Sequence, residues 1–402
     1  MAPLVVYLMS TLCARGGFDN LRTRVAPAAA AYGARLEHPI VAVVDECGDL
    51  GLLACERCAP SPLAPLVSSE CTNCDGVEVI VASCPGGKFG PGPGCKTDAA
   101  VAHFARRFPA TNPAWLAFSD DDMHYFVPWF AALLRFVEGA GHSAAVPLAL
   151  GGRDRKFKTE RIQASFHRFK DRAPCLLTGA PRIVLPLVLS SAAAAQLAPF
   201  CEKRVVEKQC GAFRTTHDTC FGVVIWRLGM PYLPVFEECR LVTNCVEIKF
   251  RAPHAIDAIS TQVTNVHRIG ETIGDAWPLV AVDRVHRGRR WEKERLTFSE
   301  NEKHLTDHDA AIRHDGSLDR LSACVNATAA SPLGDVRGIK RPIAPDAAPI
   351  TLPDCGVCRD LPLRDLQRLQ REQAAEARDR VCARSKRRPV ISDPVILGSG
   401  SG

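Results

Sequence analysis

The sequence lacks an apolar run that would cross a membrane. Its longest uncharged stretch is Ile183–Cys201, and Pro186 and Pro199 interrupt it, whereas a membrane-spanning helix needs about 20 consecutive, mostly apolar residues. Membrane association is therefore expected only through an anchor that is not visible in this chain. The apolar N-terminal stretch MAPLVVYLMSTLCA has no basic residue ahead of its apolar core, which favours a first core strand over a signal peptide.

The sequence also has little excess charge of either sign, and it has no internal repeat. Its 50 Lys and Arg residues against 44 Asp and Glu residues leave a formal net charge of +6 over 402 residues. This excess permits a phosphate-bearing ligand but is too small to indicate a nucleic-acid partner. Hydrophobic residues make up 47% of the chain, which is typical of a globular protein with a large core.

Short apolar runs alternate with helical patterns over the first 150 residues. Four runs predict buried strands: Leu4–Met9, Ile40–Val44, Val77–Ala82 and Trp115–Phe118. Helices are expected over Val25–Ala34 and Trp129–Glu138, the second with Pro128 in its first turn.

A further helix is expected after the Gly/Pro-rich loop CPGGKFGPGPGC. Thr97 or Asp98 would cap its start, and Val101, Phe104 and Phe108 would share one buried face. Strands that alternate with helices predict an α/β fold with an open sheet, and such sheets bind ligands at the carboxyl ends of their strands.

Carboxylates follow two of the predicted strands. Asp45 comes directly after one strand, and Asp120, Asp121 and Asp122 follow another. Three ionised neighbours repel one another unless a positive group compensates them. Oxygen ligands at a strand end suit a hard divalent cation such as Mn²⁺ or Mg²⁺, which keeps positions open for substrate phosphates. A solvated acidic turn is the alternative explanation for such a run.

The segment STQVTNVHRI resembles a strand of the plant and fungal branch of the fringe-like glycosyltransferases. A longer resemblance to that family lies in the stretch CKTDAAVAHFARRFPATNPAWLAFSDDDMHYFVPWFAALLRFV. It shows Cys-Lys before a helix, an aromatic strand, three aspartates, an aromatic turn and a Leu-rich helix, in the order of that family. The resemblance implies a GT-A fold, with an open, mostly parallel twisted sheet flanked by helices over 1–288. It also implies inverting transfer of a hexose or N-acetylhexosamine from a UDP-sugar to a glycan or glycoprotein hydroxyl, with Mn²⁺ or Mg²⁺, in the Golgi or secretory-pathway lumen.

Several positions acquire expected roles from this resemblance. The metal ligands would be Asp122 and His267, the latter in STQVTNVHRI, with Asp120 as a further candidate; a histidine bonded to backbone is the alternative for His267. The nucleotide-sugar contacts would come from a larger set: Asp45, Asp120, Asp121, Gly151, Gly152, Thr178 and Gly179. Thr178 and Gly179 belong to a loop in which the family's glycine run is shortened.

The motif THDTCFGVVIWRLGMPY is similar to the family's acidic helix, whose second acid is the catalytic base. That acid falls on Asp218, and His217 replaces the first acid. A carboxylate here can accept the proton of an acceptor hydroxyl as it attacks the sugar. The alternative is that Asp218 caps the helix, where the helix N-terminus favours its charge.

The 18 cysteines include two Cys-x-x-Cys pairs, Cys55 with Cys58 and Cys71 with Cys74. This spacing is typical of a closed four-cysteine zinc site. The pairs lie in a cysteine-rich insert, about 47–95, between predicted core strands, and there disulfides would hold the loop equally well in an oxidising compartment. Disulfides are favoured, and zinc remains the alternative.

The segment 289–402 differs in character from the rest. It is charged and of low complexity, and one helix is expected over 361–385. Two alternatives to the enzyme remain open: a non-catalytic relative that binds carbohydrate or nucleotide, and a zinc-dependent interaction module.

Overall fold

The structure is a computed structural model of the chain. It describes residues 1–11, 20–45, 55–74, 76–85, 91–153, 183–213, 217–228, 230–233, 235–238, 242–244, 281–283 and 317–330. All of these belong to one compact unit, Met1–Lys156 with Gly179–Asp354; the second unit, Phe157–Thr178 with Cys355–Gly402, contains none of them. The expected helix over 361–385 lies outside the described residues.

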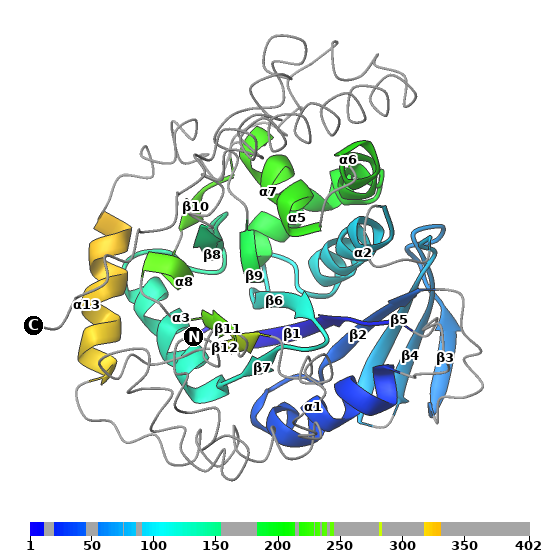
Figure 1. The fold of residues 1–402 in the computed structure, drawn as a ribbon, viewed down its shortest axis with the longest axis horizontal. Coiled ribbons are helices and arrows are strands. Elements are labelled where there is room, and N and C mark those ends of the chain that lie inside the picture. The colour runs from blue at the N-terminus through cyan, green and yellow to red at the C-terminus, as the bar shows by residue number, and fades with distance from the viewer. Residues whose placement is uncertain are drawn as a thin grey trace, which may run out of the picture. The chain divides into compact units, whose positions relative to one another are not determined.

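The described part of the chain centres on a nine-stranded sheet with the order β10-β8-β9-β6-β1-β2-β5-β4-β3 (Figure 1). The middle strands β6, β1, β2 and β5 run parallel to one another. β9 and β4 run antiparallel to their neighbours, so the sheet is mixed. The strand bounds are β1 Leu4–Met9, β2 Val41–Asp45, β3 Arg57–Pro60, β4 Val67–Cys74, β5 Val77–Ala82, β6 Trp115–Asp120, β8 Ala149–Arg153, β9 Ile183–Ser190 and β10 Tyr232–Leu233.

The middle strands form because β-branched and aromatic side chains fill both faces of the sheet. In β1, Val5 and Tyr7 belong to one apolar cluster, while Val6 and Leu8 belong to the other. This alternation follows from the two-residue period of a strand. A strand covered on both faces therefore shows an unbroken apolar run, which is the pattern that predicted β1 and β2.

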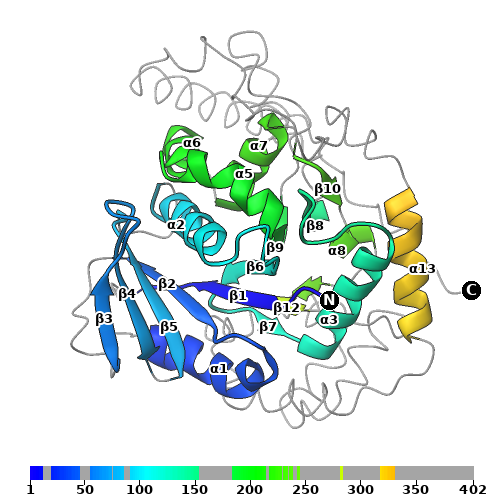
Figure 2. The same cartoon turned by 180° about the vertical axis from the view of Figure 1, so that it is seen from behind.

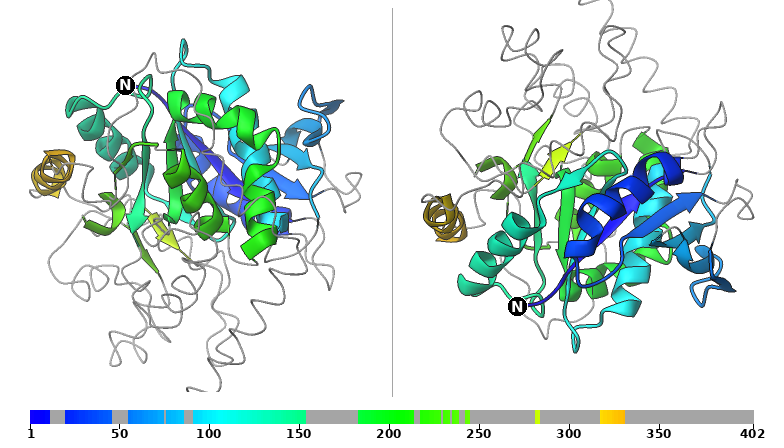
Figure 3. Two further views of the ribbon diagram at one scale, coloured as in Figure 1. Left: turned by 90° about the horizontal axis from the view of Figure 1, so that it is seen from above. Right: turned by 90° about the horizontal axis from the view of Figure 1, so that it is seen from below.

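Helices cover both faces of the sheet (Figures 1 and 3). One face carries α2 (Pro91–Arg107), α5 (Ser191–Cys201), α6 (Val205–Phe213) and α7 (His217–Arg227). The other carries α1 (Ala26–Tyr32), α3 (Val127–Gly139), α8 (Val235–Glu238) and α13 (Ser317–Ala330). Shorter elements are η1 (Leu21–Val25), η2 (Gly33–Arg35) and a small sheet of β7 (His124–Tyr125), β11 (Val242–Asn244) and β12 (Ala281–Asp283). The expected α/β class, with a large, mostly parallel sheet between helices, is confirmed.

The start of α2 differs from the sequence expectation. The helix begins at Pro91, so Thr97 and Asp98 lie within it and do not cap it. The Thr97 hydroxyl donates to the Pro93 carbonyl one turn back. Proline is tolerated in a first helical turn because its missing N–H has no partner there anyway. The Gly/Pro-rich stretch thus supplies the first turn of the helix.

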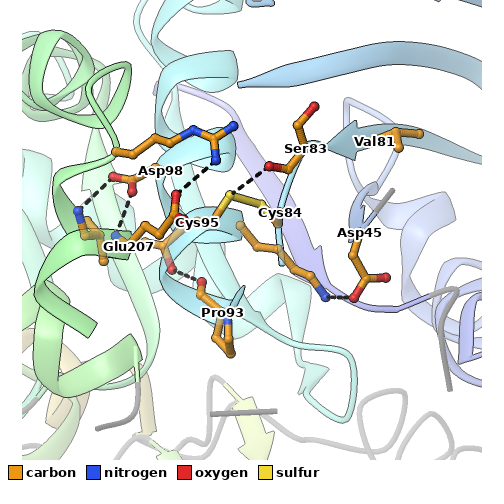
Figure 4. Close-up of a disulfide and its surroundings, with 12 residues drawn as sticks. Asp45, Val81, Ser83, Cys84, Pro93, Cys95, Asp98 and Glu207 are labelled. Carbon is orange, nitrogen blue, oxygen red and sulfur yellow. Dashed lines mark hydrogen bonds and ion pairs between the residues drawn. A yellow bond between two sulfur atoms is a disulfide. The ribbon is translucent and has the colours of Figure 1, made fainter. Parts of the chain in front are cut away.

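Asp98 caps another helix instead (Figure 4). Its carboxylate accepts the backbone N–H of Val206 at 3.1 Å and that of Glu207 at 2.9 Å, at the start of α6. Gly94 allows the close approach of the two helices, because a Cβ there would lie 2.9 Å from the Val206 carbonyl oxygen. Burial raises the pKa of Asp98 to about 8, although both N–H groups oppose this shift.

A helix also occurs in the segment that the sequence assigns to the tail. α13 buries Leu321 and Val325 in the same apolar cluster as α3. In Figure 2 it lies alongside α3. Within the described residues, no helix is both long and apolar enough to span a bilayer.

Candidate functional site

The strand order reverses direction between β1 and β6. From β1 the chain passes through α1 to β2 on one side, and from β5 it returns through α2 to β6 on the other side of β1. α1 and α2 lie on opposite faces. In open α/β sheets the carboxyl ends of the strands at such a reversal leave room for a ligand. The polar residues that follow β1, β2 and β6 therefore form the candidate site.

The three aspartates at the end of β6 have different environments. The side chain of Asp120 is 34% exposed, whereas Asp121 and Asp122 are buried. The Asp121 N–H donates to the Met9 carbonyl of β1, and the Met123 N–H closes a turn onto the Asp120 carbonyl. The turn thus directs adjacent carboxylates to different neighbours.

Asp121 is held by residues that precede β2. Ser10 Oγ donates to its Oδ2 at 2.8 Å, and Arg24 donates to its Oδ1 at 2.8 Å. Burial raises the pKa of Asp121, and the Arg24 guanidinium opposes that shift. Arg24 is about one-third exposed, so part of the guanidinium remains available to a ligand phosphate or base.

Asp45 forms a second buried polar group at the same edge. Lys96 Nζ lies 3.0 Å from Asp45 Oδ2 and donates to the Ser10 carbonyl at 2.6 Å. Thr11 Oγ1 donates to Asp45 at 2.9 Å. The Cys84–Cys95 disulfide joins the end of β5 to α2 one residue before Lys96, and Figure 4 shows this disulfide near Asp45. It fixes the helix turn that carries the lysine.

α7 approaches the strand-end aspartates from the α2 face. His217 Nε2 lies 3.7 Å from Asp120 Oδ1 and has no hydrogen-bond partner among the described residues. Burial lowers the pKa of His217, although Asp218 opposes the shift. A neutral imidazole makes a polar contact with Asp120 and no full ion pair. Asp218 lies in the first turn of α7, where the helix dipole favours its charge.

The remaining expected site residues fall into two groups. Gly151 and Gly152 lie in β8. Both β8 and β6 are antiparallel to β9, so these two strands run in the same direction. They are therefore near the same carboxyl edge of the sheet, two strands away from Asp120. Thr178, Gly179 and His267 lie outside the described residues.

Sequence patterns did not reveal Ser10, Thr11, Arg24 and Lys96 as members of this site. Thr11 and Ser10 directly follow β1, so their position after a predicted strand was a usable signal. Lys96 was part of the Cys-Lys resemblance, but its partner Asp45 belongs to another strand. No periodicity relates Arg24 to Asp121, since the contact depends on how η1 packs over the edge of the sheet.

The cysteine-rich insert contains paired cysteines. Cys55 with Cys74 and Cys58 with Cys71 are at disulfide distance, and both pairs connect β4 with the β3 side of the hairpin. Among the described residues, the group Cys55, Cys71 and Cys74 is the only set of three His, Cys, Asp or Glu side chains whose ligand atoms lie within 4.8 Å of one another. The favoured disulfides are thus present, in two cross-strand pairs.

Comparisons with known proteins add no assignment. No protein-family model matches the chain, and no curated protein matches it.

Proposed function

We propose that this protein is a metal-dependent, inverting glycosyltransferase of GT-A type that uses a UDP-sugar and belongs with the fringe-like enzymes. One observation carries the proposal: the contact between His217 and Asp120. It joins two separate motifs that resemble that family, the aspartate run and the HDTCFG helix. It brings the expected base, Asp218, to the edge where the expected metal and nucleotide ligands lie.

The donor atoms at this edge fit a hard divalent cation. Asp120 presents a partly exposed carboxylate, and a neutral His217 nitrogen lies 3.7 Å from one of its oxygens. Mn²⁺ or Mg²⁺ needs only one or two carboxylates when diphosphate oxygens and water complete its shell. Asp120 and Asp122 would hold the ion, with His267 as the expected further ligand. When bound, the ion would offset the charge that develops on the leaving UDP.

The groups around Asp45 and Asp121 suit a nucleotide. Arg24 offers a cation, and Thr11 and Asp45 offer hydroxyl and carboxylate groups of the kind that bind a ribose or a base. Lys96 and Arg24 already pair with Asp45 and Asp121, while Asp120, Asp122 and Asp218 add further carboxylates, so the edge carries an excess of acidic groups. That arrangement favours UDP accompanied by a cation over a free polyanion.

The chemistry assigned to the chain is one proton transfer. Asp218 accepts the proton of the acceptor hydroxyl while the oxygen attacks the anomeric carbon and UDP leaves from the opposite side. His217, held neutral by burial, adds no positive charge that would stabilise the ionised acid. A single displacement inverts the anomeric carbon and needs no covalent intermediate on the protein.

We infer the compartment from the cysteines. Where both cysteines are in the described part of the chain, four pairs lie at disulfide distance: Cys55–Cys74, Cys58–Cys71, Cys84–Cys95 and Cys210–Cys220. Disulfides persist in oxidising compartments, which supports a place in the Golgi or secretory-pathway lumen. The proposed acceptor is a glycan or glycoprotein hydroxyl.

Calorimetry of UDP binding with and without Mn²⁺ tests the metal site. Asp122→Asn removes one anionic ligand and should abolish the Mn²⁺-dependent part of UDP affinity. The matched control is Asp319→Asn on the exposed side of α13, which should leave UDP affinity unchanged. Equal affinities for the parent and Asp122→Asn, with Mn²⁺ present, would remove this residue from the metal site.

Transfer assays against a panel of UDP-sugars test the base. Asp218→Asn keeps the size of the side chain but cannot accept a proton, so turnover should fall on the order of 10² to 10⁴-fold while UDP affinity stays within a few-fold. Glu202→Gln on the exposed end of α5 is the control. A parent protein that binds UDP with Mn²⁺ but transfers no sugar would establish the non-catalytic alternative.

A further inference from the structure

The two Cys-x-x-Cys segments meet across the hairpin of β3 and β4. Cys58 of β3 is the direct cross-strand partner of Cys71 of β4. Cys55, which precedes β3, is at disulfide distance from Cys74 at the end of β4. The sulfurs of Cys55, Cys71 and Cys74 lie within 4.8 Å of one another. Cys58 is outside this group of three, but it forms a disulfide with Cys71, which belongs to the group.

A bulge in β4 brings the sulfurs together. Residues three apart in a regular strand point to opposite faces, yet Cys71 and Cys74 are both buried in the same apolar cluster. They pair with Val79 and Val77, which are only two residues apart, so β4 carries an extra residue here. Asn73, between the two cysteines, has a φ of +51°, a left-handed conformation that asparagine tolerates.

Two cross-strand disulfides do not need this convergence, because each pair could lie on its own face of a regular ladder. A tetrahedral metal site does need it. Four thiolates at about 2.3 Å from a zinc ion lie about 3.8 Å from one another. The sulfurs of Cys55, Cys71 and Cys74 already lie within 4.8 Å of one another, and reduction frees the exposed Cys58 to complete the set. We propose that Cys55, Cys58, Cys71 and Cys74 form a redox-switched zinc site, with two disulfides in the oxidised state and one bound Zn²⁺ in the reduced state.

The interconversion balances with a dithiol as reductant. Each disulfide takes two electrons and two protons from one dithiol, which becomes a disulfide itself. The four thiols formed release four protons as their thiolates bind one Zn²⁺. In the reverse direction two oxidising disulfides accept four electrons and take up four protons to become two dithiols, the two protein disulfides form again, and the ion leaves. The direction is thus set by the thiol–disulfide balance of the compartment.

The position of the hairpin makes such a switch feasible. β3 is the outer strand of the sheet, and Cys58 is exposed, so a thiol or an ion can reach the site from solvent. The hairpin lies at the far end of the strand order from β6 (Figure 2). The inference therefore does not depend on the proposed transferase activity. Either state fixes β3, a four-residue edge strand, whereas in the reduced, metal-free state its described strand pairing is with β4 alone.

The experiment is metal titration of the full chain, reduced by a dithiol under nitrogen and freed of metal. Co²⁺ serves as a spectroscopic probe, and Zn²⁺ displaces it. We expect one Co²⁺ per chain with the visible spectrum of a tetrahedral four-thiolate site, and no such spectrum before reduction. Trypsin should cut after the exposed Arg57 in the reduced, metal-free chain, and Zn²⁺ should restore resistance. Diamide-type oxidation should release the zinc.

Two matched variants locate the site. Cys58→Ser changes the exposed ligand and should weaken Zn²⁺ binding at least tenfold, with a cobalt spectrum of lower thiolate intensity. Cys355→Ser/Cys358→Ser removes the other Cys-x-x-Cys pair of the chain and should leave the titration unchanged. A reduced parent chain that binds no stoichiometric metal overturns the proposal, as does zinc binding that Cys58→Ser leaves intact or that the control double variant abolishes.

Discussion

Replacement of Lys96 by methionine is the sharpest test of the polar edge of the sheet. The ammonium group contacts the Asp45 carboxylate at 3.0 Å and the Ser10 carbonyl at 2.6 Å. Both side chains of the pair are at least 95% buried. Methionine preserves the length of the side chain but removes the ammonium group from the Asp45 carboxylate, which still accepts from the Thr11 hydroxyl.

The expected cost is large because one buried charge loses its partner. Breaking a buried ion pair from one side destabilises a protein by about 3–5 kcal/mol, and that is the loss we expect for Lys96→Met. Asp45→Leu should cost a similar amount, since it leaves the ammonium group unpaired. The double variant should cost less than the sum of the two, because it removes both charges and fills the space with apolar atoms.

Urea unfolding with the disulfides intact measures these free energies. Lys203→Met, on the exposed turn after α5, is the control and should change stability by less than about 0.5 kcal/mol. A cost below about 1 kcal/mol for Lys96→Met, with additive effects in the double variant, would show that the pair is solvated and that this edge is not a desolvated polar site.

Two further predictions concern the contact between α2 and α6. Gly94→Ala should destabilise the protein by about 1–3 kcal/mol through overpacking, because its Cβ would lie 2.9 Å from Cys210 Sγ and from the Val206 carbonyl oxygen. The control Gly139→Ala should not destabilise it, because no atom lies within 4 Å of the added Cβ. Equal unfolding midpoints for the two variants would contradict the close contact. The stability of the parent relative to Asp98→Asn should be greatest below about pH 4 and should decline as the pH rises to about 8. Burial raises the pKa of Asp98 to about 8, so its carboxyl binds the proton more tightly in the folded state than in the unfolded state. Thermal unfolding from about pH 4 to about pH 9 measures this difference, and a difference that grows with pH would contradict the prediction.

Local sequence was sufficient for the middle of the sheet. The apolar runs at Leu4–Met9 and Val77–Ala82 form β1 and β5 with the expected bounds, and the aspartates occupy the ends of β2 and β6. These predictions succeeded because a strand buried on both faces has an unbroken apolar pattern that does not depend on its neighbours. The helix α2 was predicted, but its start was not, because its first turn consists of prolines and glycines, which are typical of loops.

The antiparallel strands were not predictable in this way. The direction of β9 between β6 and β8 leaves no mark on its own residues, because the same apolar pattern fits either direction. The pattern of polar and apolar residues in this segment likewise does not predict the bulge at Asn73. Both features follow from how distant segments pair.

The sequence by itself therefore determined the chemistry that this protein can carry: carboxylates after buried strands, a His-Asp pair at a helix start and two Cys-x-x-Cys segments. Those assignments depend on residue type and on short-range spacing. Only the tertiary structure decided which of these groups meet. It placed Lys96 on Asp45, Arg24 on Asp121 and His217 beside Asp120, because such contacts depend on strand order and on how the helices pack over the sheet, and these arise from the burial of the whole core.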